Sequence, residues 1–207
     1  MKRVLLGTPV YGSIHHECLN GLMDTALNSE VAEFVIRVVR GTYVNVNRNR
    51  IVDAAKDEKC DDVLMVDSDM AVTRAHIERL LSHDVDIVGA VYCKRVEGPT
   101  EWLFHCNEGA TPDERGLLPV NDIGTGVTRI SMRVFEAIEK RFPERAYQHK
   151  GRPVRHEYFP IGVYHGEFLG EDVFFCRLAK ECGFDIWADT QVVIGHIGTA
   201  TFPLKQP

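Results

Sequence analysis

Short apolar runs alternate with amphipathic segments along the first half of the chain. The apolar runs are rich in β-branched residues and bounded by glycine or polar residues, which is typical of strands, and they lie at 3–6, 34–39, 63–66 and 85–92. Between them, apolar residues recur at helical spacing within 14–27, 51–55 and 77–81, and Thr73 is placed to cap the third of these helices. The alternation predicts an α/β fold whose central sheet is mostly parallel and is flanked by helices. Such sheets bind ligands at the carboxyl ends of their strands.

The second half has a different pattern. Residues 96–122 contain six glycines and prolines between short apolar pieces, which indicates loops and short strands over one edge of the sheet. The remaining pattern predicts a strand at 127–131, a helix at 132–141, a polar and aromatic loop at 143–169, a helix at 171–182 closed by Gly183, and a last strand at 190–194. Because no repeat or linker interrupts the chain, we expect one domain over residues 1–207.

The composition is that of an ordinary globular protein. Of the 207 residues 44% are hydrophobic and 26% are charged, which excludes disorder, a collagen-like repeat and a coiled coil. No apolar run approaches the roughly 20 residues that span a bilayer, and the N-terminal segment has no recognisable secretion signal. The six cysteines form no C-x-x-C pair, so we expect reduced, buried thiols. These features favour a cytoplasmic protein that does not insert into membranes.

The charge does not indicate a nucleic-acid-binding protein as a whole. With 24 Lys and Arg against 30 Asp and Glu, the formal net charge is -6. One segment, 147–155, is locally basic because it carries Lys150, Arg152 and Arg155. It is either a solvated loop or a basic face that contacts phosphates.

Two aspartates follow the apolar run 63–66 and flank Ser68. In extended chain, the carboxylates of Asp67 and Asp69 project toward the same side, where they can share a divalent cation. Acids near the end of a buried strand are costly to desolvate unless a cation or hydrogen bonds compensate them. The alternative is a pair of loop carboxylates that cap the next helix.

Two segments of the second half carry further candidate chemistry. Gly124, Thr125 and Gly126 precede the strand at 127–131, where glycines allow the backbone to approach a ligand or simply permit a tight turn. Glu171 and Asp172 open the helix at 171–182. They either interact with the helix dipole or place a carboxylate at the floor of a pocket, where it can accept a proton.

Three more positions lie at strand ends or helix starts. His196 follows the last strand, where an imidazole completes a mixed carboxylate metal site or serves a structural role. Arg48 and Asn49 precede the second predicted helix, and the turn at 8–11 follows the first strand. Phosphates and nucleosides are commonly held at such places, although the arginine could equally pair with surface acids.

Taken together and in order, these segments resemble the GT-A-fold glycosyltransferases, which use a nucleotide-diphosphate sugar and a divalent metal. The match covers nearly the whole chain, from the Thr-Pro-x-Tyr turn through the Arg-Asn pair, the D-x-D motif, the glycine loop and the Glu-Asp helix start to the C-terminal histidine. The segments VLMVDSDM and GEDVFFC look most like small stand-alone transferases of phages, large viruses and bacteria. The resemblance implies a Rossmann-like nucleotide-binding half at 1–95 and a smaller, loop- and β-rich acceptor and catalytic half at 96–207.

The resemblance also implies a role for each matched residue. Mn²⁺ or Mg²⁺ would be held against the diphosphate by Asp67, Asp69 and His196. The nucleotide sugar, expected to be a UDP-sugar, would lie against Thr8, Pro9, Tyr11, Arg48, Asn49, Asp67, Ser68 and Asp69. The transferred sugar or the acceptor would lie against Gly124, Thr125 and Gly126, and Asp172 would be the catalytic carboxylate with Glu171 beside it.

The implied reaction is transfer of a hexosyl or pentosyl group to an acceptor hydroxyl. A metal offsets the charge on the departing nucleoside diphosphate, and the acceptor hydroxyl needs a base. With Asp172 as that base an in-line displacement inverts the anomeric carbon, which we favour over retention. The acceptor stays open among a glycan, a protein and, for a phage source, a hydroxymethylated DNA base; a viral protein would act in the host cytoplasm.

Other functions fit parts of the pattern. A D-x-D phosphatase also places an aspartate after an apolar strand, and a nucleotidyltransferase can share a related fold. A module that binds sugar nucleotides or nucleic acid without turnover is a further alternative. A phosphatase would hydrolyse phosphate esters, a nucleotidyltransferase would release pyrophosphate, and a binding module would be stabilised by ligand without forming product.

Overall fold

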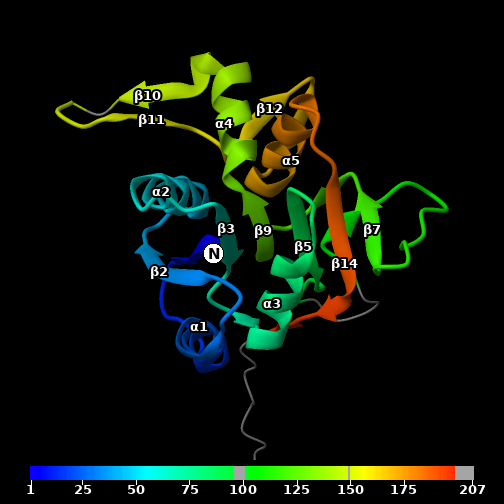
Figure 1. Cartoon of the computed structure of the whole chain (residues 1–207). Coiled ribbons are helices and arrows are strands. Elements are labelled where there is room, and N and C mark those ends of the chain that lie inside the picture. Colours follow the sequence, from blue (N-terminus) through cyan, green and yellow to red (C-terminus); the bar gives the residue numbers. More distant parts are fainter. Residues whose placement is uncertain (96–100, 149, 199–207) are drawn as a thin grey trace, which may run out of the picture.

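The protein is built on a mixed β-sheet with helices on both faces (Figure 1). The computed structural model describes residues 1–95, 101–148 and 150–198. In these ranges a seven-stranded sheet has the order β2-β1-β3-β9-β5-β14-β7. Its strands are β1 (Arg3–Val10), β2 (Glu33–Arg40), β3 (Asp62–Val66), β5 (Ile87–Val91), β7 (Leu117–Val120), β9 (Val127–Ser131) and β14 (Ile186–Val193).

The directions of the strands correct the prediction of a mostly parallel sheet. Strands β1 and β2, β1 and β3, and β5 and β14 pair in parallel, whereas β9 pairs antiparallel with both β3 and β5, and β7 with β14. The four strands predicted from the first half do share one direction. The strand predicted at 127–131 forms as β9, and β7 lies in the segment predicted to hold loops and short strands, but the antiparallel pairing of both within the main sheet was not predicted.

Five α-helices of the described chain cover the sheet. They are α1 (His16–Asn28), α2 (Val44–Asp57), α3 (Arg74–Ser82), α4 (Met132–Arg141) and α5 (Glu171–Glu181). Helices α1 and α3 lie on one face, and α2, α4 and α5 lie on the other (Figure 1). Thr73 caps α3 as predicted, because its Oγ1 accepts a hydrogen bond from the backbone N–H of His76. None of the helices in the described ranges has the length and apolar character needed to cross a bilayer.

Short strand pairs and one 3₁₀ turn lie outside the main sheet. The pairs are β4 (Met70–Ala71) with β15 (Gly195–His196), β6 (Phe104–His105) with β8 (Asp122–Ile123), β10 (Ala146–Gln148) with β11 (Val154–His156), and β12 (Gly162–Tyr164) with β13 (Glu167–Leu169). The turn η1 (Pro143–Arg145) precedes β10. The polar segment predicted as a loop at 143–169 therefore contains two hairpins.

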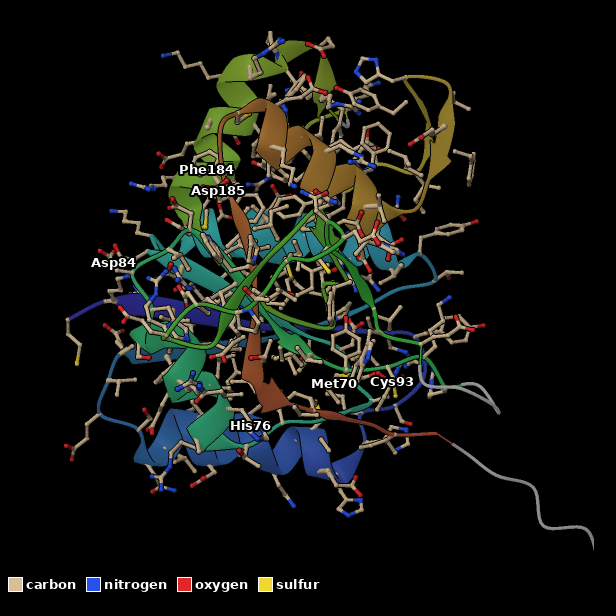
Figure 2. The ribbon with its side chains drawn as sticks, turned by 90° about the vertical axis from the view of Figure 1, so that its right-hand side faces the viewer. Met70, His76, Asp84, Cys93, Phe184 and Asp185 are labelled. Carbon is tan, nitrogen blue, oxygen red and sulfur yellow. The ribbon has the colours of Figure 1, made fainter. Side chains whose placement is uncertain are left out.

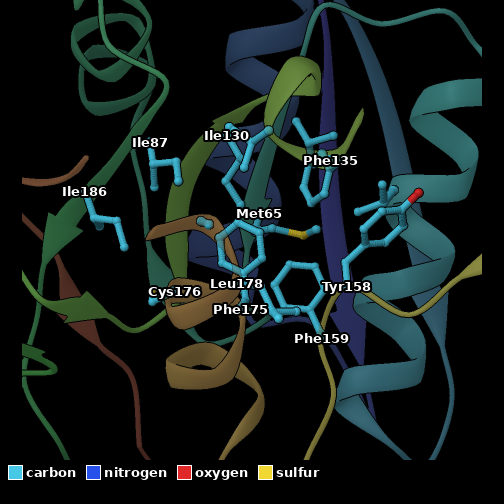
Figure 3. Packing of buried hydrophobic residues seen from close by; sticks show 14 of the residues in the cluster. Met65, Ile87, Ile130, Phe135, Tyr158, Phe159, Phe175, Cys176, Leu178 and Ile186 are labelled. Carbon is cyan, nitrogen blue, oxygen red and sulfur yellow. The ribbon is translucent and has the colours of Figure 1, made fainter. Parts of the chain in front are cut away.

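Alternation along β1 divides the apolar core between the two faces of the sheet. Leu5 faces the cluster beneath α2, α4 and α5, whereas Val4 and Leu6 face the cluster beneath α1 and α3. In the first cluster the rings of Phe159 and Phe175 stack with centroids 4.8 Å apart (Figure 3). This stacking packs α5, which carries Asp172, against the segment that follows β11.

Two expectations about burial are wrong. Leu19, Met23 and Leu27 were assigned to the apolar face of the first helix, but they are 42%, 43% and 72% exposed. Helix α1 instead buries Cys18, Gly21, Leu22 and Thr25. The thiols are free, as expected, but Cys106 is exposed and Cys93 and Cys182 are only half-buried.

Gly21 allows helix α1 to pack closely against Val72, the residue that follows β4. A Cβ atom at this position would lie 2.0 Å from the carbonyl oxygen of Val72, which is backbone and cannot move aside cheaply. We expect Gly21→Ala to lower the free energy of unfolding by about 1 to 3 kcal/mol through overpacking, although alanine has the higher helix propensity. Urea denaturation measures this effect. Gly12→Ala is the control, because no atom lies within 4 Å of its added Cβ, and equal stability of the two variants would contradict the close contact.

Candidate active site

The predicted site residues come from distant parts of the chain and meet at the carboxyl end of β3. Met70 and Cys93 lie at this end of the sheet, whereas Asp84 and Asp185 lie at the opposite end (Figure 2). The short strand β15 pairs with β4 directly after the D-x-D segment, so that His196 lies opposite Met70. The backbone N–H of Ile197 also donates to the carbonyl oxygen of Asp69 over 2.8 Å.

Asp69 and His196 face each other across this pairing. The Nε2 of His196 lies 3.5 Å from Oδ2 of Asp69, and its Nδ1 lies 2.8 Å from the carbonyl oxygen of Cys93. Because a carbonyl oxygen only accepts, Nδ1 carries the proton in the neutral ring and Nε2 presents its lone pair toward Asp69. Arg95 forms an ion pair with the same carboxylate, because its Nη1 lies 3.0 Å from Oδ2 of Asp69.

Arg48 joins three carboxylates beneath the site. Its side chain is 2% exposed, and Nη2 lies 3.1 Å from both carboxylate oxygens of Asp67. The same guanidinium lies 3.5 Å from Glu171 and 3.7 Å from Asp172. Arg48 therefore connects the D-x-D segment to the start of α5.

The site has more negative than positive charge. Burial raises the pKa of Asp67 to about 6; Arg48 lowers this pKa, and the neighbouring carboxylates raise it. Burial and the charge of Asp172 also raise the pKa of Glu171. Burial alone would lower the pKa of Arg48, but Asp67, Asp172 and Glu171 together raise it. When Asp67, Asp69, Glu171 and Asp172 are all ionised, Arg48 and Arg95 balance only half of their charge.

The glycine loop lies against Asp172 and the D-x-D segment. The hydroxyl of Thr125 donates to Oδ1 of Asp172 over 2.5 Å, and the backbone N–H of Asp67 donates to the carbonyl oxygen of Gly126 over 2.7 Å. Asp172 is 30% exposed, so that this anchored carboxylate still reaches the surface of the site.

Tyr92, which was not predicted from the sequence, holds the glycine loop in place. Its buried hydroxyl oxygen accepts the N–H of Gly126 over 2.7 Å. A Cβ atom at Gly124 or Gly126 would lie 2.4 or 2.6 Å from that oxygen, so both positions need glycine. Burial, together with the charge of Asp172, raises the pKa of Tyr92, which stays a neutral phenol. The sequence held one signal: Tyr92 ends the strand predicted at 85–92, at the ligand-binding edge of the sheet.

We expect Tyr92→Phe to destabilise the protein by about 1 to 3 kcal/mol, because it leaves the buried N–H of Gly126 without an acceptor. Tyr43→Phe is a matched control, since Tyr43 is 69% exposed. Urea denaturation of both variants measures the difference. A Tyr92→Phe variant as stable as the control would show that the hydroxyl does not anchor the loop.

A cavity of about 180 Å³ opens beside the D-x-D segment. Its lining includes five of the eight predicted nucleotide-binding residues, namely Pro9, Tyr11, Asp67, Ser68 and Asp69, together with Asn47 and Thr42. Tyr11 is 77% exposed at its edge. Helix α2 begins at Val44, so Arg48 and Asn49 lie within the helix rather than before it.

Three predicted residues do not line this cavity: Thr8, Asn49 and Arg48, which contacts Asp67. Thr8 is fully buried and is not among the lining residues. The side-chain oxygen of Asn49 accepts the backbone N–H groups of Tyr158 and Phe159 at 2.8 and 3.2 Å. Asn49 therefore ties α2 to the chain that follows β11.

The side chains at this site could supply two ligands of a divalent cation. No group of three or more His, Cys, Asp and Glu side chains in the described ranges is arranged to hold a metal. Asp69 and His196 form a pair of suitable ligands, since a carboxylate and a neutral imidazole both bind Mn²⁺. Both oxygens of Asp67 contact Arg48 instead. A metal held here would take its remaining ligands from water or a bound substrate.

Comparison with known proteins identifies relatives only at the level of structure. No family model matches the chain, and no curated protein sequence does. The crystal structure of A197 from STIV aligns with a TM-score of 0.54 and 16% identity, covering 100% of this chain and 99% of that one. A glycosyltransferase involved in the glycosylation of the major capsid of PBCV-1 aligns with a TM-score of 0.37 and 14% identity over 70% of this chain and 68% of that one. The first alignment shows a shared fold.

Proposed function

We propose that the protein is a metal-dependent glycosyltransferase of the GT-A type, which transfers a sugar from a nucleotide-diphosphate donor to an acceptor hydroxyl. The observation that carries the proposal is the convergence of Asp69, His196, Arg48 and Asp172 at one end of the sheet. These residues are far apart in sequence, and they place a pair of candidate cation ligands, a buried arginine and a partly exposed carboxylate within one group. The protein with the shared fold, A197 from STIV, supports the architecture alone.

The donor nucleotide is assigned to the cavity beside the D-x-D segment. Pro9 and Tyr11 offer apolar surface for a base, and Thr42 and Asn47 offer polar groups for a ribose. The acidic residues Asp67 and Asp69 line the same cavity and would repel a diphosphate on their own. This charge pattern favours a donor that binds together with a cation, and we propose a UDP-sugar.

Asp69 and His196 are the proposed ligands of Mn²⁺ or Mg²⁺. The excess of two negative charges among the ionised carboxylates matches one divalent cation. When bound, the metal acts as a Lewis acid that offsets the negative charge on the departing diphosphate. Asp67 was predicted as a third ligand; because Arg48 contacts both of its oxygens, we assign Asp67 to holding Arg48 under the donor.

Asp172 is the proposed base. Thr125 donates to one of its oxygens, which leaves the other available for an acceptor hydroxyl. The guanidinium of Arg48 lies 3.7 Å from the oxygen that Thr125 contacts. A base that deprotonates the acceptor for in-line attack leads to inversion at the anomeric carbon, and Glu171 adds negative charge beside it.

Ligand-dependent thermal stability tests the donor site. The protein is melted with a panel of nucleotide sugars, each with Mn²⁺, Mg²⁺ or EDTA. One nucleotide sugar is expected to raise Tm by about 5 °C at a concentration near 100 Kd, in the presence of metal only. Asp69→Ala is expected to abolish the rise. Asp185→Ala is the control, because Asp185 is exposed at the opposite end of the sheet (Figure 2).

Two results would contradict the proposal. If no nucleotide sugar raises Tm with metal present, the cavity is not a donor site. If a donor stabilises the protein equally in EDTA and in the Asp69→Ala variant, the metal site is wrong. Hydrolysis of a simple phosphate ester by the unmodified protein would instead favour the phosphatase alternative.

A further inference from the structure

A larger cavity lies apart from the candidate active site, between α2 and the hairpin β10–β11. It has a volume of about 610 Å³ and is lined by Val46, Arg50, Asp53, Ala54 and Asp57 of the helix and by Tyr147, Arg152, Pro153 and Arg155 of the hairpin segment. Figure 1 shows this hairpin extending from the body of the protein beyond α2. We refer to these nine residues as the hairpin groove. Its volume is in the range of small-molecule binding sites.

The hairpin groove and the donor cavity share no lining residue. Positions 46, 50, 53 and 57 follow one another at helical spacing and form one stripe of the helix. Arg48, Val52 and Ala55 are buried on the other side, against the sheet and the D-x-D segment. A ligand in the groove therefore does not compete with the donor nucleotide.

The groove has one positive charge in excess. Arg155 is paired with both oxygens of Asp57 at 3.3 and 3.1 Å, and its Nε lies 3.6 Å from Asp53. Arg50 and Arg152 form no ion pair with any residue that the structure describes, and both are exposed. The lining of the groove contains three arginines and two aspartates, so its one excess positive charge can neutralise one anionic group of a ligand.

The remaining groups suit a sugar ring. Val46, Pro153 and the ring of Tyr147 provide apolar surface for the C–H face of a saccharide. Asp53 and Asp57 can accept hydrogen bonds from hydroxyl groups. Burial raises the pKa of Asp53 to about 6, and a hydroxyl donor would offset that desolvation. Two carboxylates in the wall and a net charge of -6 over the whole chain disfavour a polyphosphate backbone.

We propose that the hairpin groove binds an acidic saccharide, a sugar ring with one carboxylate or phosphate, whose anionic group contacts Arg50 and Arg152 and whose hydroxyls contact Asp53 and Asp57. This site is independent of the proposed transfer reaction. It gives the protein a second carbohydrate contact, whose lining residues are distinct from those of the donor cavity.

Ligand-observed NMR titration tests the site with three probes: glucuronate, glucose 6-phosphate and glucose. At least one of the two acids is expected to bind ten-fold or more tightly than glucose, and the comparison of the acids separates carboxylate from phosphate. The double variant Arg50→Gln/Arg152→Gln is expected to weaken that binding at least ten-fold. Arg177→Gln is the control, because Arg177 is 40% exposed on α5 and its nearest carboxylate, Glu167, is 3.9 Å away.

Three outcomes would overturn the proposal: equal binding of acidic and neutral sugars, full binding by the double variant, or binding of an oligothymidylate in preference to both acids. The last would identify a nucleic-acid contact instead. The donor-induced rise in Tm is measured on the same samples. The double variant should retain it, so loss of saccharide binding with an intact donor response concerns the groove alone.

Discussion

Asp172→Asn is expected to lower kcat of sugar transfer by about 10²- to 10⁴-fold, the usual contribution of a general base, and to leave donor binding nearly unchanged. Asparagine keeps an oxygen that can accept from Thr125, so the local geometry is retained. It cannot take a proton from an acceptor hydroxyl. The measurement is a steady-state assay on an acceptor found by screening, together with the donor-induced rise in Tm.

Glu171→Gln is the matched control for this prediction. The two acids are adjacent and both face Arg48, at 3.5 Å for Glu171 and 3.7 Å for Asp172. The hydroxyl of Thr125 contacts only Asp172 of the two, which singles it out as the positioned base. If Glu171→Gln lowers kcat of sugar transfer and Asp172→Asn does not, Glu171 rather than Asp172 is the base.

Arg48→Met is expected to destabilise the protein by about 3 to 5 kcal/mol at neutral pH, because it leaves buried carboxylates without their cation. Arg48 is 2% exposed and faces Asp67, Glu171 and Asp172. Urea denaturation measures the loss. Arg37→Met is the surface control: Arg37 pairs with Glu58 but is 45% exposed, and such pairs contribute at most about 1 kcal/mol.

The effect of Arg48→Met depends on pH in a defined direction. The pKa of Asp67 is already raised to about 6 in the folded protein, so its protonated form is favoured by folding. Removing Arg48 raises that pKa further. The destabilisation relative to the unmodified protein should therefore be largest above pH 7 and shrink as the pH falls toward 5. An Arg48→Met variant as stable as Arg37→Met, with no pH dependence, would contradict the role of Arg48 as the anchor.

The strands and helices of the first half could be predicted because their patterns are local. The runs at 63–66 and 85–92 became β3 and β5, and Thr73 caps α3. The position of β9 between β3 and β5 could not be predicted in the same way. Pairing partners and strand direction depend on contacts between residues distant in sequence, and the composition of a strand does not encode them.

The site was predictable where a motif lies at a strand end and less so inside a helix. Asp69 follows β3 and His196 follows β14, and the two side chains lie 3.5 Å apart, whereas Asp67 contacts Arg48. Arg48 and Asn49 are adjacent, but successive helix positions differ in direction by about 100°. Only the folded α2 shows that Arg48 faces the carboxylates while Asn49 binds the backbone at Tyr158.

The most direct test of the proposed function is release of nucleoside diphosphate from a panel of nucleotide sugars incubated with the purified protein and Mn²⁺. A water molecule can take the place of the acceptor hydroxyl in this assay, so no acceptor need be known. We expect one donor to be consumed, EDTA or Asp69→Ala to stop the reaction, and Asp172→Asn to slow it. If a folded protein consumes none of the donors and none raises its Tm, the glycosyltransferase assignment is contradicted.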